Sequence, residues 1–174
     1  MDNNKITKCN ENSWKRKLGI DISGHYDIAL KSTKESRLRL LHFKILHNIY
    51  PTNILLHKMK VKSSDACEHC RVPDYIEHFF YECALVHSFW LHIVNLIKSR
   101  VNVDFDLKRN DILLGLAYTD FTHIKREIIN YINHIILIGK LCISKFRYGQ
   151  INNIFLIFEI EMSLRRVTAP LMSK

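Results

Sequence analysis

Glycine and proline are scarce in this chain of 174 residues, which contains five of the first and three of the second. Folds built from many short strands need frequent turns, so the scarcity argues against a sandwich or barrel. Long apolar runs are missing too, because polar residues such as Asn133 and Glu159 interrupt the stretches at 128–143 and 151–160. Each falls well short of the roughly 18 unbroken apolar residues of a membrane span. We therefore expect no transmembrane segment and no membrane partner.

Acidic residues are also in the minority, with 17 of them against 26 lysines and arginines, and the formal net charge is +9. A basic chain attracts polyanions, and nucleic acid is the commonest partner of that kind. An alternative source of the charge is base composition, since Lys, Asn and Ile are abundant here and have AT-rich codons. The position of the charges therefore matters more than their sum.

A secretory signal is not visible at the start of the chain. Residues 1–12 are polar, without the apolar core and small-residue cleavage site of such a signal, so we expect an intracellular protein of the nucleus and/or cytoplasm. In such a chain five cysteines, an odd number, make a poor disulfide framework, which leaves free thiols or metal ligands. Three of the five lie between residues 67 and 83.

Apolar residues recur at helical spacing along most of the chain, which predicts a mainly α fold. Ser32 followed by Glu35 is a capping-box signal for a helix that ends before Pro51, and Thr52 caps a short helix after it. Residues 84–100 have the broad apolar face of a helix in the middle of a domain.

The second half continues this pattern. A short element at 111–116 precedes a long helix, capped by Asp120 and ended by Gly149, with Cys142 on its apolar stripe. Residues 151–166 are apolar nearly all round and predict a last, packed helix. The chain thus divides into a loosely ordered segment (1–30), a basic helix with a metal-binding domain (31–100) and a C-terminal helical segment (101–174).

Four potential metal ligands lie in one short segment. Cys67 and Cys70 form a Cys-x2-Cys pair, and after seven residues His78 begins a His-x4-Cys pair with Cys83. A Cys-x2-Cys turn brings two thiolates to adjacent corners of a tetrahedron, and a second pair closes it as in structural zinc sites. We expect one structural Zn²⁺ with four protein ligands and no open position for catalysis. The predicted fold is a small zinc-stabilised helical domain followed by long packed helices.

The alternative is that Cys67 and Cys70 are small buried apolar residues and His78 is a surface histidine. His69 and His87 also lie close enough in sequence to replace an assigned ligand. In favour of a metal, a turn-rich segment this short cannot bury itself without help, and a bound metal supplies folding energy.

Most of the excess positive charge precedes this segment. Residues 31–62 contain eight basic residues and one acidic residue, a balance of +7 out of +9. Such a surface suits a phosphate backbone, and Tyr75, Phe79, Phe80 and Tyr81 offer rings for base stacking, although Phe79 or Phe80 is expected in the core. The alternative is a solvated basic face with no specific partner. The candidate nucleic-acid-binding residues are Lys34, Arg37, Arg39, Lys44, Lys58, Lys60, Lys62 and Arg71.

Three strings around these residues follow the order of a known family. Residues 40–52 read LLHFKILHNIYPT, the Cys-x2-Cys pair comes next, and HFFYEC at 78–83 is followed by SFW at 88–90. This order resembles the C-terminal zinc-binding region of LINE-type non-LTR retrotransposon reverse transcriptases. The resemblance covers roughly residues 36–165 and is strongest over 38–97.

The resemblance implies a role in holding template RNA or target DNA during target-primed reverse transcription. The chain would be the end of a longer enzyme or a fragment of one, with RNA and/or DNA and the polymerase part of the parent protein as partners. Alternatively, the broad apolar faces of residues 84–100 and 151–166 predict a zinc-stabilised module that docks on protein, for example on the rest of a polymerase.

Polymerase chemistry is not visible in the sequence. A reverse-transcriptase palm needs adjacent carboxylates to hold two metal ions, but no Asp-Asp pair occurs, and Asp120 is followed by Phe121. Asp104, Asp106 and Asp111 are scattered and are interpreted as helix caps or loop residues. We therefore expect that this chain is not itself an enzyme.

Overall fold

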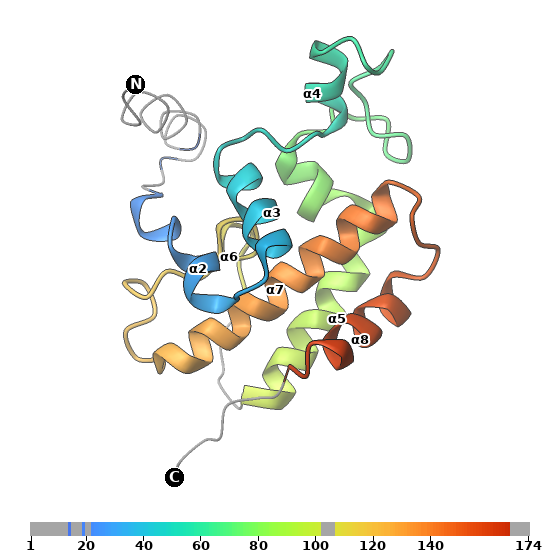
Figure 1. Cartoon of the computed structure of the whole chain (residues 1–174). Coiled ribbons are helices and arrows are strands. Elements are labelled where there is room, and N and C mark those ends of the chain that lie inside the picture. Colours follow the sequence, from blue (N-terminus) through green and yellow to red (C-terminus); the bar gives the residue numbers. More distant parts are fainter. Residues whose placement is uncertain (1–13, 15–18, 20–21, 102–106, 168–174) are drawn as a thin grey trace.

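The computed structural model describes residues 14, 19, 22–101 and 107–167. Over these residues the fold is mainly α, as predicted, and the only β pairing is a single bridge between Ala66 and Pro73 (Figure 1). In chain order the elements are the short 3-10 helix η1 (Ser23–His25), α2 (Ile28–Ser32), α3 (Ser36–Leu46), α4 (Asn53–Lys58), the one-turn π-helix η2 (His78–Glu82), α5 (Ala84–Val101), α6 (Arg109–Leu114), α7 (Arg126–Arg147) and α8 (Ile154–Leu164).

Helix α7 occupies the centre of the molecule. Figure 1 shows it running diagonally, with α2 and α3 on one side and α5 and α8 on the other, and it contacts all four. Nearly every residue from Ile128 to Ile143 is buried. A side chain at Gly139 would place its Cβ 2.7 Å from Cδ1 of Ile93, so glycine at this position allows α5 to approach closely. Helix α4 and the loop after it stand at one end of this bundle.

The predicted capping box of Ser32 and Glu35 is wrong. Ser32 is the last residue of α2, and Glu35 instead donates its backbone N–H to Oγ1 of Thr33 at 3.1 Å. Helix α3 begins at Ser36 and ends at Leu46, ahead of the predicted end at Pro51. It stops there because Asn48 has a left-handed backbone (φ 53°), which a helix cannot continue through.

The start of α7 also differs from the prediction. Asp120 lies in a turn, and the helix begins only at Arg126, with Lys125 as its N-cap residue. Its end agrees, because Gly149 has a φ of 67° just after the last turn. The ends of helices α4, α5 and α8 agree to within three residues with the regions predicted from apolar spacing or capping.

One continuous hydrophobic core joins the predicted metal-binding and C-terminal parts of the chain. Its buried residues extend from Trp14 to Met162, and Cys142 belongs to it, as expected. Because this core includes residues on both sides of residue 100, the predicted domain boundary at that position stays a prediction from the sequence. Among the helices described, none combines the length and apolar character that crossing a bilayer requires.

The predicted loosely ordered segment, 1–30, falls largely outside the described residues, as does Cys9. Trp14 is described, is buried, and donates its Nε1 hydrogen to the backbone carbonyl of Leu46 at 2.8 Å. Ile22 and Ile28 are buried as well. At least these positions of the segment therefore pack against the helical body.

Candidate metal centre

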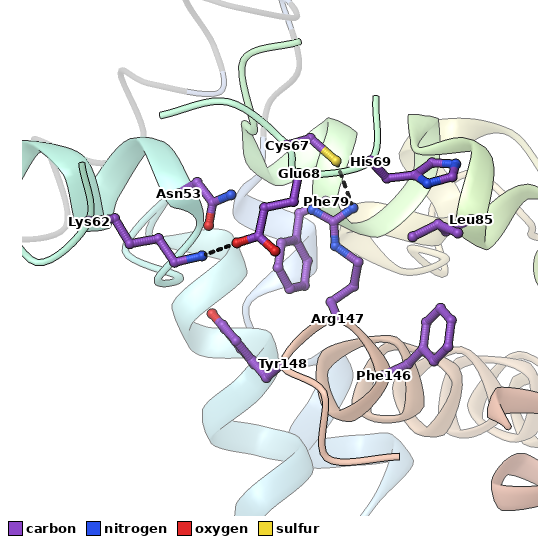
Figure 2. Close-up of a pocket in the computed structure, with 10 residues that line it drawn as sticks. All are labelled: Asn53, Lys62, Cys67, Glu68, His69, Phe79, Leu85, Phe146, Arg147 and Tyr148. Atoms are coloured by element: carbon purple, nitrogen blue, oxygen red, sulfur yellow. Dashed lines mark hydrogen bonds and ion pairs between the residues drawn. The ribbon is translucent and has the colours of Figure 1, made fainter. Parts of the chain in front are cut away.

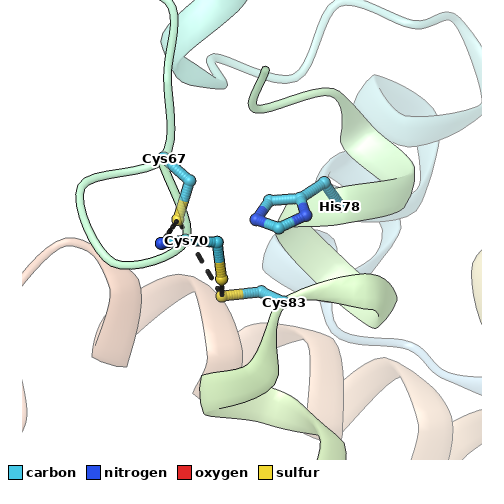
Figure 3. A group of neighbouring side chains, drawn as sticks. All are labelled: Cys67, Cys70, His78 and Cys83. Atoms are coloured by element: carbon cyan, nitrogen blue, oxygen red, sulfur yellow. Dashed lines mark hydrogen bonds between the residues drawn. The ribbon is translucent and has the colours of Figure 1, made fainter. Parts of the chain in front are cut away.

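The first pair of thiols lies on a tight turn. The backbone N–H of Cys67 donates to the carbonyl of Val72 at 2.7 Å, and that of Arg71 donates back to the carbonyl of Cys67 at 2.9 Å. Arg71 has a left-handed backbone (φ 61°), which reverses the chain. The turn directs Cys67 inward, where it is buried, and leaves Cys70 half-buried (Figure 3).

The π-helical turn η2 fixes the relative positions of the second pair, His78 and Cys83. A π-helix bonds residues five apart, so His78 and Cys83 lie one turn from each other on the same side. The bond from the Cys83 backbone N–H to the carbonyl of His78, at 3.0 Å, closes this turn. Helix α5 begins at the next residue, Ala84, which anchors the pair to the helical body.

The two pairs meet as the sequence predicts. One ligand atom from each of Cys67, Cys70, His78 and Cys83 lies within 4.8 Å of the other three. Sγ of Cys83 is 3.9 Å from Sγ of Cys67 and 3.6 Å from Sγ of Cys70. Thiolates about 2.3 Å from a tetrahedral zinc ion are separated by about 3.8 Å. The arrangement therefore has the dimensions of a tetrahedral metal site.

His78 supplies a further indication of a metal. It is buried, contrary to the alternative that it is a surface histidine, and its Nε2 has no hydrogen-bond partner within the described part of the chain. A buried polar atom without a partner is costly, and a metal ion would satisfy it. His69 and His87 are exposed and are not members of the cluster.

The thiols differ in how readily they ionise. Burial alone would raise the pKa of Cys67, but the nearby backbone N–H of Cys70, the imidazole of His78, the backbone N–H of His69 and the guanidinium of Arg147 lower it to about 6. Burial raises the pKa of Cys83 to about 12, and the neighbouring thiols add to the rise. A cation in their midst favours the thiolate forms, so metal binding should release protons.

Two residues that the sequence analysis did not assign to the site complete its surroundings. Arg147, in the last turn of α7, donates from Nη1 to Sγ of Cys83 at 2.8 Å and to Sγ of Cys67 at 3.3 Å. Its Nη2 donates to Oδ1 of the fully buried Asp74 at 2.7 Å. Figure 2 shows the guanidinium beside the ring of Phe79. Both side chains line a cavity of about 130 Å³ together with Cys67.

The predicted basic residues differ in their surroundings. Arg39 has a structural role, because its guanidinium donates to the carbonyls of Thr33 and Leu30 at the end of α2. Lys62 pairs with Glu68 at 2.8 Å (Figure 2). Lys62 also lines a cavity of about 370 Å³ together with Arg71. The remaining candidates, exposed except for the half-buried Lys44, are Lys34, Arg37, Lys44, Lys58 and Lys60.

A third cavity is lined in part by residues of α4. It has a volume of about 170 Å³ and is lined by Asn48, Lys58 and Tyr75 together with apolar side chains. Tyr75 is 49% exposed, whereas Phe79 and Phe80 are buried in the core. Of the four rings considered for base stacking, Tyr75 is therefore the best placed.

Comparison of the chain with protein-family models, curated proteins and solved structures finds no match in any of the three. A function must therefore be argued from the metal centre and the basic side chains around it.

Proposed function

We propose that this chain is a non-catalytic, zinc-stabilised module that binds nucleic acid. The observation that carries the metal part is the clustering of three thiols and one imidazole within 4.8 Å of one another. Soft sulfur ligands with one nitrogen suit Zn²⁺, and four protein ligands leave no coordination position for a reacting water. The zinc would therefore be structural.

The distribution of basic side chains supports a nucleic-acid partner. Lys62 and Arg71 line the cavity beside the metal segment, together with the hydroxyl-bearing Ser63 and Ser64. Cations and hydroxyls are the usual contacts to phosphate oxygens. In the third cavity, Lys58 would contact phosphate while the exposed ring of Tyr75 stacks on a base.

The proposal extends to the class of parent protein. The order of the motifs, from the basic helix through the Cys-x2-Cys pair to HFFYEC and SFW, is similar to the C-terminal zinc-binding region of LINE-type non-LTR reverse transcriptases. In that setting the module would help to hold template RNA or target DNA during target-primed reverse transcription. The same cavity-lining side chains would contact nucleic acid whether the chain works alone or within a longer protein.

Salt dependence of binding tests the nucleic-acid part. We expect the zinc-loaded full chain to bind a mixed-sequence 20-nucleotide RNA or DNA strand with an affinity that falls steeply as salt rises. Lys58→Gln should reduce the slope of log K against log salt by about 0.7 to 0.9, the value for one phosphate contact. Arg126→Gln is the matched control, because Arg126 lies at the other end of α7 from the metal centre. Absence of binding, or binding that ignores salt, would contradict the proposal.

A second candidate function is docking on protein, for example on the rest of a polymerase. Helix α8 exposes an apolar stripe at four-residue spacing, with Leu156, Ile160 and Leu164 exposed by 56%, 42% and 73%. A contact through this stripe would bury apolar surface and respond little to salt. One substitution distinguishes the two functions, because Ile160→Ser should abolish docking on protein and leave the affinity for nucleic acid unchanged.

A further inference from the structure

Arg147 reaches the metal centre from far along the chain. It follows Cys67 by 80 residues and Cys83 by 64, yet its guanidinium donates to both sulfur atoms. The side chain is only 7% exposed and lies 4.6 Å from the centre of the Phe79 ring. A charged group held this deeply needs a compensating partner. Part of that compensation is Asp74, and the sulfur atoms are the rest.

Charge balance explains why a cation belongs there. Three thiolates and a neutral imidazole around one divalent cation have a net charge of −1, which is unfavourable in a buried site. The carboxylate of Asp74 adds a further −1, and the guanidinium of Arg147, at hydrogen-bond distance from two of the sulfurs and from this carboxylate, offsets one of the two negative charges. Hydrogen bonds to ionised acceptors are stronger than neutral ones, so these contacts gain strength when the metal holds the cysteines as thiolates.

Asp74 fixes the orientation of this cation and extends the network to α4. Its Oδ1 accepts from Nη2 of Arg147, and its Oδ2 lies 3.4 Å from the backbone N–H of Asn53, the first residue of α4. The Asn53 side chain donates to the carbonyl of Ala66 at 2.8 Å, next to Cys67. The end of α7, the start of α4 and the metal segment therefore meet at the Arg147–Asp74 pair.

We propose that Arg147 is an outer-sphere positioning residue of the metal centre, oriented by Asp74, and that it ties helices α7 and α4 to the bound metal. This inference rests on the metal site of the proposed function. Partners in the second coordination shell tune metal affinity as well as ligand orientation, and losing one typically costs about 10- to 100-fold in affinity. The metal would thus stabilise contacts with α7 and α4, which are distant in sequence, as well as the short segment that contains its ligands.

Cobalt and zinc binding to the full chain test this role. Arg147→Met should weaken Zn²⁺ binding about 10- to 100-fold in a chelator competition. In the Co²⁺ form, the sulfur-to-cobalt charge-transfer band should move to longer wavelength, because sulfurs that lose a hydrogen bond become more electron-rich. Lys145→Met is the matched control: it removes a cation from the same helix turn, one that pairs with Glu161 and not with a thiol. It should change neither affinity nor spectrum.

The outcomes separate this inference from the proposed function. If the wild-type chain binds neither metal, the metal site itself is wrong. If the wild type binds metal and Arg147→Met binds it equally tightly with the same spectrum, the role of Arg147 is wrong. Should Arg147→Met fail to fold, Arg147→Lys replaces it, because an ammonium cannot reproduce the planar fork that reaches Asp74 and both sulfurs. Unchanged affinity and an unchanged spectrum in that variant would equally overturn the inference.

Discussion

Lys140 is a fully buried lysine in the middle of α7. Its ammonium nitrogen donates to the carbonyl of Leu113 at 2.8 Å, and the side chain has no exposed surface. Burial lowers its pKa to about 7. His42 is buried nearby, and its pKa lies well below the usual value, first because of burial and then because of the charge on Lys140. These polar groups in the core make stability depend on pH.

Replacing Lys140 by methionine should remove a specific part of that dependence. Between pH 7 and about 10.4 the unfolded lysine holds a proton that the folded one lacks, so wild-type stability rises with pH by up to about 1.4 kcal/mol per unit. At pH 6 the lysine is charged in both states and its burial is most costly. Lys140→Met should be more stable there by about 2 kcal/mol, even with the Leu113 carbonyl unpaired.

Urea unfolding of wild type and Lys140→Met between pH 6 and 9 measures this difference. The advantage of the variant should shrink steadily as pH rises. Parallel stability profiles for the two proteins would show that Lys140 does not titrate in this window when folded.

The four ligands could be predicted from the sequence because their chemistry is local. A Cys-x2-Cys pair and a His-x4-Cys pair within 17 residues bring their ligand atoms together through short turns. Arg147 and Asp74 could not be assigned, because their contact spans 73 residues and depends on how α7 docks. Lys140 and Arg147 are both basic residues of α7, and only the packing distinguishes the buried Lys140 from Arg147, whose guanidinium contacts two sulfur atoms.

Helix ends, too, could be predicted where the signal is strong and local, and not where it depends on tertiary packing. The limits of α5 agree with the prediction to within one residue, because its apolar spacing is strong and the helix begins directly after Cys83. The start of α7 is five residues later than a cap at Asp120 predicts. A capping residue type is a weak signal on its own, since Asp also favours the turn in which Asp120 lies.

Helix α8 has a cap that the structure identifies and a mutation can test. Oδ1 of Asn153 accepts a hydrogen bond from the backbone N–H of Leu156 at 3.0 Å. Asn153→Ala should lower the free energy of unfolding by about 1 kcal/mol, the usual value of such a cap. The exposed neighbour Asn152 is a matched control, and Asn152→Ala should have little effect. Equal losses in the two variants, measured by chemical denaturation, would contradict the cap.

The whole molecule is held together by α7 and, on our account, by the metal at its end. The core around α7 is large and continuous, so the helical body has its own source of stability. The segment from Ala66 to Cys83 has little regular structure beyond one bridge and one helical turn, although Ile76, Phe79 and Phe80 pack into that core. Metal binding would add folding free energy to this segment. Its effect would reach α7 through Arg147 and α4 through Asp74.

Metal stoichiometry by native mass spectrometry tests the central claim most directly. The purified wild-type chain should carry one zinc ion, and Cys70→Ser and His78→Ala should each lose it, whereas replacing the uninvolved buried Cys142 by alanine should not. A circular-dichroism melt of the same samples should show that chelator lowers the melting temperature of the wild type. A folded wild-type protein without zinc, or zinc that persists in both ligand variants, would contradict the account.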